Sequence, residues 1–236
     1  MNTNRAQISI RDAAIAYVAA WLVGNLAAGS VLAASGYDTV AEAGPGWLVA
    51  ISVAQWLPFL IALFLLGRRC GIGEPFTDYG LSFRPIDLIG IPIGIATQMV
   101  LIPLLYRPLE SIWPDTFGSD QIEERARDLW DSASGSGVAL LIYVVVIGAP
   151  LVEELVYRGL LQGALGRRLR QWHGWLSVAV VAALFALIHF SPVEYPGLFV
   201  IGLVLGACAL CTGRLGMGVL AHAAFNAAGL ALVAGS

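Results

Sequence analysis

Charge is scarce in this sequence, and lysine is missing altogether. Charged residues make up 12% of the 236 residues, and all 13 basic residues are arginines. Soluble domains carry about 25% charged residues, so the composition excludes an ordinary water-soluble domain. The net charge of −3 leaves no basic surface for nucleic acid. Cysteine is also scarce. Cys208 and Cys211 form a C-x-x-C within an apolar run, which favours packing between helices over a redox or metal pair.

The sequence consists mainly of long apolar runs. Hydrophobic residues make up 58% of the chain, and the mean hydropathy is +0.78. A membrane-spanning helix needs roughly 20 apolar residues. The runs predict an all-α, polytopic membrane helix bundle in a single integral membrane domain, residues 1–236, with about seven transmembrane helices. The predicted spans lie near 12–34, 46–67, 86–106, 138–165, 174–190, 196–212 and 215–233.

One polar segment between spans has the pattern of a surface helix. Residues 119–131 mix acidic and basic side chains with Ile122, Leu129 and Trp130. Such a mixture is typical of a short amphipathic helix lying at the membrane interface. Ser119 is of the residue type that caps a helix N-terminus, so we expect the helix to start there.

The distribution of arginine predicts the orientation. With seven spans, nine arginines share the side of the N-terminus: Arg5, Arg11, Arg68, Arg69, Arg84, Arg167, Arg168, Arg170 and Arg214. Three lie on the other side: Arg107, Arg125 and Arg127. Cytoplasmic loops are enriched in arginine. We therefore expect a multi-pass protein of a bacterial or archaeal cell membrane, with its N-terminus in the cytoplasm.

Ionisable side chains on the predicted spans gather in the C-terminal half. Glu153, Glu154 and Arg158 lie on the fourth span, His189 ends the fifth, and His222 lies on the seventh. Placing a charge at the centre of a membrane costs about 2.5–3.5 kcal/mol on insertion scales. The five groups therefore need partners and a reason to be there.

Helical spacing suggests how these groups are arranged. Glu154 and Arg158 are four residues apart, so they share one helix face and can pair. Glu153 points about 100° away from Glu154 around the helix and can face a cavity. The spacing of four recurs in His222 and Asn226. Three helices could thus direct polar groups into one water-filled pocket.

That set of groups suits the hydrolysis of an amide. Glu153 and His189 can hold a water molecule and remove its proton, while His222 and Asn226 can donate hydrogen bonds to a developing oxyanion. The same atoms permit a rival arrangement in which Glu153, His189 and His222 bind zinc and leave one position open for water. The sequence does not separate these mechanisms, so zinc stays a possible cofactor.

The motifs also resemble a known family. Glu153-Glu154-x-x-x-Arg158, Phe185-x-x-x-His189 and His222-x-x-x-Asn226 follow one another on successive apolar segments. In this order they are similar to the CAAX-protease and bacteriocin-processing family, also called Abi or type II CAAX prenyl endopeptidases. The resemblance covers about residues 138–233.

The resemblance implies an intramembrane endopeptidase that acts on a peptide or a lipidated protein among membrane lipids, with the scissile bond near the membrane surface. It also implies the roles above, with Glu154 and Arg158 organising the site.

Two other functions share these residues. A non-enzymatic scaffold or bacteriocin-immunity protein would keep the pocket for binding. A small transporter or channel would use the polar groups as a pathway, but the sequence shows no repeat symmetry of the kind common in transporters.

Overall fold

The structure is a computed structural model that describes residues 7–169 and 174–235. Its regular elements within these ranges are all helices. Six helices are long and apolar enough to cross a membrane: Ile10–Ser35, Val40–Cys70, Pro85–Ile112, Ser136–Arg168, Tyr195–Thr212 and Gly216–Ala234. The prediction of an all-α polytopic membrane bundle is confirmed, and the protein is an integral membrane protein.

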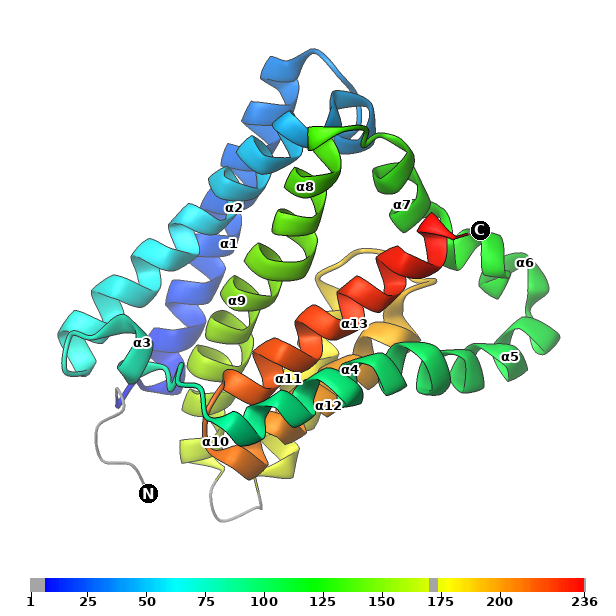
Figure 1. Ribbon diagram of the computed structural model, residues 1–236. Coiled ribbons are helices and arrows are strands. Elements are labelled where there is room, and N and C mark those ends of the chain that lie inside the picture. Colours follow the sequence, from blue (N-terminus) through cyan, green and yellow to red (C-terminus); the bar gives the residue numbers. More distant parts are fainter. Residues whose placement is uncertain (1–6, 170–173, 236) are drawn as a thin grey trace.

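The first two spans form an antiparallel hairpin along one side of the molecule (Figure 1). Helix α1 (Ile10–Ser35) ends at Gly36, whose φ of 78° suits glycine. Helix α2 (Val40–Cys70) begins with a capping box between Thr39 and Glu42. A Cβ atom at Gly24 would lie 2.6 Å from the carbonyl oxygen of Gln55. Glycine at this position therefore lets the two helices approach closely at mid-span.

The third span is built from four consecutive helical segments: η1 (Pro85–Ile89), α4 (Gly90–Ala96), η2 (Thr97–Leu101) and α5 (Ile102–Ile112). Its first half lies against α13 (Gly216–Ala234). Gly90 and Gly94 face the backbone of α13 so closely that neither position has room for a Cβ atom. The third span therefore forms one wall beside the last helix.

The fourth span runs between the α1–α2 hairpin and α13 (Figure 1). It consists of α8 (Ser136–Ile142), η3 (Tyr143–Gly148), α9 (Ala149–Glu153), η4 (Glu154–Gln162) and α10 (Gly163–Arg168). Segments η3 and η4 are π-helical. Such turns are rare and are often found at functional sites.

The predicted fifth span is shorter than its apolar run. Helix α11 covers Trp175–Leu187, which is 13 residues, or about 20 Å at the rise of an α-helix. That length falls short of a hydrocarbon core about 30 Å thick. The chain then turns at Phe190, a non-glycine residue with φ of 52°, and continues into α12 (Tyr195–Thr212).

Three short helices lie outside the spans: α3 (Pro75–Asp78), α6 (Pro114–Phe117) and α7 (Ser119–Asp131). Helix α7 is the predicted amphipathic helix. Its N-cap position is occupied by Gly118, in an extended conformation, so Ser119 is the first helical residue and not the cap. The helix packs against both α13 and α2.

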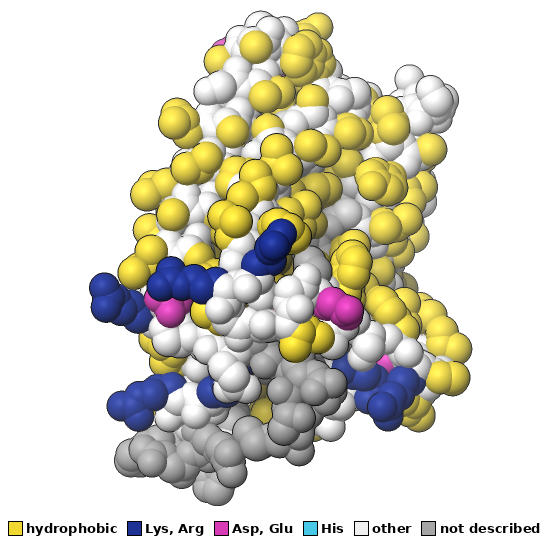
Figure 2. Space-filling model, turned by 90° about the vertical axis from the view of Figure 1, so that its left-hand side faces the viewer, with side chains coloured by type: hydrophobic (Ala, Val, Ile, Leu, Met, Phe, Trp, Pro, Cys, Tyr) yellow, Lys and Arg dark blue, Asp and Glu magenta, His cyan; other side chains and the backbone are white. Residues whose placement is uncertain are grey.

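Charged side chains are unevenly distributed over the surface. On the face drawn in Figure 2, hydrophobic side chains are spread over the upper part, and most arginines and acidic residues gather in the lower half. Arg68, Arg69 and Arg84 lie at the ends of the second and third spans. Arg5 and Arg170 of the predicted arginine set lie outside the described residues. This separation of apolar and charged surface fits a protein embedded in lipid.

Candidate active site

The centre of the site is a buried ion pair on the π-helical segment η4. Nη1 of Arg158 donates to Oε1 of Glu154 at 2.7 Å, and both side chains are fully buried. Nη2 of Arg158 donates to the carbonyl oxygen of Gly202 on α12 at 3.2 Å. The pairing expected from the spacing of four residues is therefore present. It offsets the cost of burying two opposite charges.

His222 joins this pair from α13. Its Nδ1 lies 3.2 Å from Oε1 of Glu154. Since a carboxylate only accepts hydrogen bonds, Nδ1 carries the proton. Its Nε2 lies 3.8 Å from Oε2 of Glu153. The imidazole ring is thus placed between two carboxylates and is itself almost fully buried.

Glu153 differs from its neighbour in exposure. Its side chain is 27% exposed, whereas that of Glu154 is 0% exposed. Glu153 lines a cavity of about 110 Å³ together with Gln55 and Tyr157. Glu153 therefore faces a cavity, as the helical spacing indicated, and it stays in reach of His222.

Phe185 of α11 separates the two histidines. Its ring centroid lies 4.9 Å from that of His189 and 6.0 Å from that of His222. The guanidinium carbon of Arg158 also lies over this ring, 4.9 Å from its centroid. Nδ1 of His189 lies 2.6 Å from the carbonyl oxygen of Phe185. That oxygen only accepts, so Nδ1 donates and Nε2 is left facing away as the free ring nitrogen.

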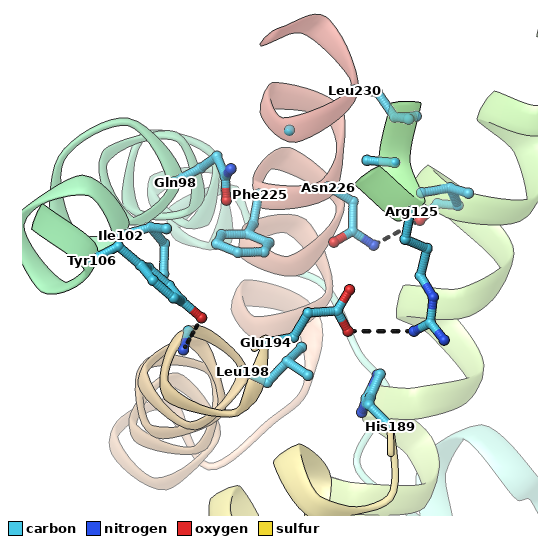
Figure 3. Close-up of a pocket in the computed structure, with 14 residues that line it drawn as sticks. Gln98, Ile102, Tyr106, Arg125, His189, Glu194, Leu198, Phe225, Asn226 and Leu230 are labelled. Carbon is cyan, nitrogen blue, oxygen red and sulfur yellow. Dashed lines mark hydrogen bonds and ion pairs between the residues drawn. The ribbon is translucent and has the colours of Figure 1, made fainter. Parts of the chain in front are cut away.

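A second and larger cavity, of about 330 Å³, is lined by His189 and Asn226 (Figure 3). Nδ2 of Asn226 donates to the carbonyl oxygen of Val145 at 2.8 Å, which fixes the amide and leaves its second N–H available. An ion pair of 3.3 Å between Arg125 and Glu194 lines the same cavity. Because Arg125 lies on the interfacial helix α7, this cavity reaches the expected membrane surface.

Part of the chain matches a known family. Residues 135–228 match the model of the family described as type II CAAX prenyl endopeptidase Rce1-like. This segment is therefore similar to that family, and residues 135–228 are called the Rce1-like domain below. The comparisons with curated proteins and with solved structures found no significant match.

The Rce1-like domain begins just before α8 and ends within α13. It contains all six residues predicted for the site: Glu153, Glu154, Arg158, His189, His222 and Asn226. Two elements outside the matched segment also line the cavities. The α1–α2 hairpin lines the smaller cavity, and the third span lines the larger one. The site is therefore assembled from the Rce1-like domain and the helices that precede it.

The structure brings the predicted residues together in two groups. Glu153, Glu154, Arg158 and His222 form one connected cluster. His189 and Asn226 line the larger cavity, whereas Glu153 lines the smaller one. The two groups line separate cavities in this structure, so a single pocket shared by all the predicted residues stays a prediction.

The three residues predicted for the alternative zinc site do not form one compact group among the described residues. Among the described residues, no three His, Cys, Asp or Glu side chains gather closely enough to hold a metal ion. Glu153 and His222 are neighbours, but the third proposed ligand, His189, lies on the other cavity.

Two polar contacts were missed in the sequence. Buried Gln162 donates from Nε2 to the carbonyl oxygen of Gly206 on α12 at 2.9 Å. Its position, four residues after Arg158, repeats the spacing of the motif and could have drawn attention to it. The hydroxyl groups of Tyr17 and Tyr157 lie 3.2 Å apart. No short-range pattern could indicate that contact, since it joins residues 140 positions apart.

Proposed function

We propose that the protein is an intramembrane endopeptidase that hydrolyses a peptide bond near the membrane surface of a peptide or a lipidated protein. The observation that carries this proposal is the contact of 3.8 Å between Glu153 and Nε2 of His222. His222 also contacts Glu154 of the buried Glu154–Arg158 pair. A partly exposed carboxylate and an imidazole held by a second carboxylate are groups that suit amide hydrolysis.

Water activation is assigned to Glu153 and His189. Glu153 is ready to take a proton from a water molecule as its oxygen attacks the scissile carbonyl carbon. When its ring is neutral, His189 donates from Nδ1 to the Phe185 carbonyl and has Nε2 as its acceptor nitrogen. His189 lines the larger cavity, so in this arrangement it accepts a hydrogen bond from the water once that water reaches the substrate. His189 packs on the ring of Phe185, and Glu153 contacts His222, which packs on the same ring.

Oxyanion stabilisation is assigned to His222 and Asn226. As the carbonyl carbon becomes tetrahedral, its oxygen gains negative charge and needs donors. Because Nδ1 of His222 contacts Glu154, the ring can donate to the oxyanion only through a protonated Nε2. With both ring nitrogens protonated, the cluster of Glu153, Glu154, Arg158 and His222 has zero net charge. Asn226 is held by Val145 and has one amide N–H left to donate.

Collapse of the tetrahedral intermediate completes the reaction. The C–N bond breaks, and the proton first taken by Glu153 passes to the departing amine. The carboxylate of Glu153 is thereby restored, and the new carboxyl group leaves with the acyl fragment. Glu154 and Arg158 do not touch the substrate in this scheme; they position His222.

The decisive experiment is the replacement Glu153→Gln in protein reconstituted into liposomes. It keeps the size of the side chain but removes the proton acceptor, so cleavage of a fluorogenic peptide or lipidated peptide should fall by about 100-fold or more. Glu124→Gln, at an exposed position on α7, is the matched control and should cleave at the wild-type rate. A folded Glu153→Gln protein with full activity would exclude Glu153 as the base.

A chelation experiment tests the zinc alternative. Because His189 lies on a different cavity from Glu153, we expect activity to survive dialysis against a strong chelator. Metal analysis of the dialysed, active protein provides the check. Activity that disappears on chelation and returns with added zinc would favour a metal site formed by Glu153, His189 and His222.

A further inference from the structure

The smaller cavity lies between the Rce1-like domain and the α1–α2 hairpin. Its polar lining comes from Glu153 of the fourth span, Asn25 of α1 and Gln55 of α2. Aromatic and aliphatic side chains complete the walls: Trp21, Trp56, Phe59, Tyr157, Val152, Val156 and Ile188. Three polar side chains from three helices thus line one otherwise apolar chamber, with Asn25 exposed and Gln55 half-buried.

The positions of Asn25 and Gln55 along their spans are unusual. Asn25 lies near the middle of Ile10–Ser35, and Gln55 lies near the middle of Val40–Cys70. Polar side chains at membrane depth face the bundle interior or a water-filled cavity. Close contact of the helix backbones at Gly24 and Gln55 holds the two helices at this level.

The hydrogen-bonding capacity of the two amides is only partly used. Nδ2 of Asn25 donates to the carbonyl oxygen of Trp21 at 2.8 Å, so its Oδ1 is left to accept. Gln55 is half-buried, and its side chain makes no hydrogen bond to the described residues. The chamber therefore offers one carboxylate and two amides, with donors and acceptors both present.

The size and polarity of the chamber fit water. A site needs about 10–15 Å³ of accessible volume and two to four polar partners to hold one water molecule. The chamber has about 110 Å³, so it has room for several. A peptide is far too large for this volume, whereas the 330 Å³ cavity on the other side is roomier and is lined mainly by apolar groups.

We infer that the chamber lined by Asn25, Gln55 and Glu153 holds the water that is consumed in hydrolysis, and that the substrate binds in the cavity of His189 and Asn226. Gln55 and Asn25 are then positioning residues that orient water toward Glu153. This assignment rests on the proposed function, because Glu153 is its proton acceptor. It gives the hairpin outside the Rce1-like domain a direct part in the reaction.

The first test measures water in the chamber without using activity. In a variant with Cys70, Cys208 and Cys211 replaced by alanine, Gln55→Cys is treated with a charged methanethiosulfonate reagent in liposomes. Only a thiolate reacts, and a thiolate forms in water. Leu57→Cys is the control on the same helix, since Leu57 is exposed on the apolar surface.

Cysteine at position 55 should react at least about tenfold faster than cysteine at position 57, because only the former is hydrated. Equal rates, or no reaction at position 55, would overturn the water chamber. This result does not depend on whether the protein cleaves peptides. It therefore separates failure of the chamber from failure of the proposed function.

The second test divides the roles of the two cavities by kinetics. Gln55→Leu should lower kcat about tenfold with little change in KM, because water and not substrate is displaced. Gln98→Leu is the matched change in the larger cavity and should raise KM with little change in kcat. Gln55→Glu, which keeps a polar group, should restore most of kcat. A Gln55→Leu enzyme with wild-type kcat, or with a change confined to KM, would refute the assignment.

Discussion

Two buried ion pairs hold this bundle together, and they differ in how completely they are satisfied. At one end of the molecule, Asp87 accepts from Nε and Nη2 of Arg214 at 2.9 and 2.7 Å and from the backbone N–H of Arg84 at 2.8 Å. At the centre, Glu154 and Arg158 are also 2.7 Å apart. Yet Oε2 of Glu154 and Nε of Arg158 are buried without a hydrogen-bond partner among the residues that the structure describes.

The difference distinguishes a structural pair from a pair that serves a site. Asp87 has its acceptors filled by a bidentate arginine, the strong geometry for such a contact, and it ties the start of the third span to the start of α13. Buried polar atoms without partners are costly and rare. Among the described residues the centre has two of them, so stability alone does not account for its geometry, as expected for a pair that serves a site.

The largest effect should come from breaking the central pair. Arg158→Met leaves Glu154 as a buried charge with no cation beside it, which should cost about 3–5 kcal/mol of stability. Activity should be lost as well, because Glu154 then no longer positions His222. Unfolding in detergent and peptide cleavage in liposomes are the two measurements.

A double variant sharpens this prediction. Glu154→Gln combined with Arg158→Met removes both charges, so most of the lost stability should return. Cleavage should stay absent, since His222 loses the carboxylate that holds its Nδ1. Recovery of activity together with stability would show that the pair is only structural.

The pair at the end of the molecule should behave in the opposite way. Asp87→Asn keeps the shape but weakens the hydrogen bonds to Arg214 and Arg84, at a cost of about 1–3 kcal/mol. Because neither cavity is lined by Asp87, kcat measured below the melting temperature should not change. A loss of kcat in folded Asp87→Asn protein would place this end of the bundle in the reaction.

The fold was largely predictable because lipid imposes a simple rule on sequence. Each apolar run that the composition indicated became a helix, and six reached membrane-spanning length. Helix α11 is the exception, at 13 residues. Its run continues to Phe190, but the backbone turns there through a positive φ. Hydropathy alone does not register such a turn.

The site was predictable only where it is local. The spacing of four residues indicated the Glu154–Arg158 pair, and one residue of rotation placed Glu153 on a cavity. Contacts between helices were beyond reach, because they depend on how the spans cross. His222 meets Glu154 across 68 positions in the chain, and Asp87 meets Arg214 across 127. Asp87 lies at the edge of a predicted span, and the sequence around it has no pattern that indicates Arg214 as its partner.

The smallest effect should come from a third ion pair, which is neither buried nor complete. Arg125 and Glu194 are 3.3 Å apart, and the arginine side chain is 60% exposed. Such a pair contributes at most about 1 kcal/mol and weakens with salt. Arg125→Gln should therefore leave the unfolding midpoint nearly unchanged.

Because the pair lines the cavity of His189 and Asn226, the same variant should alter KM for charged peptides and lose that difference at high salt. A large drop in stability would instead show that α7 is held to the bundle mainly through this contact, and the contrast between buried and exposed pairs would fail.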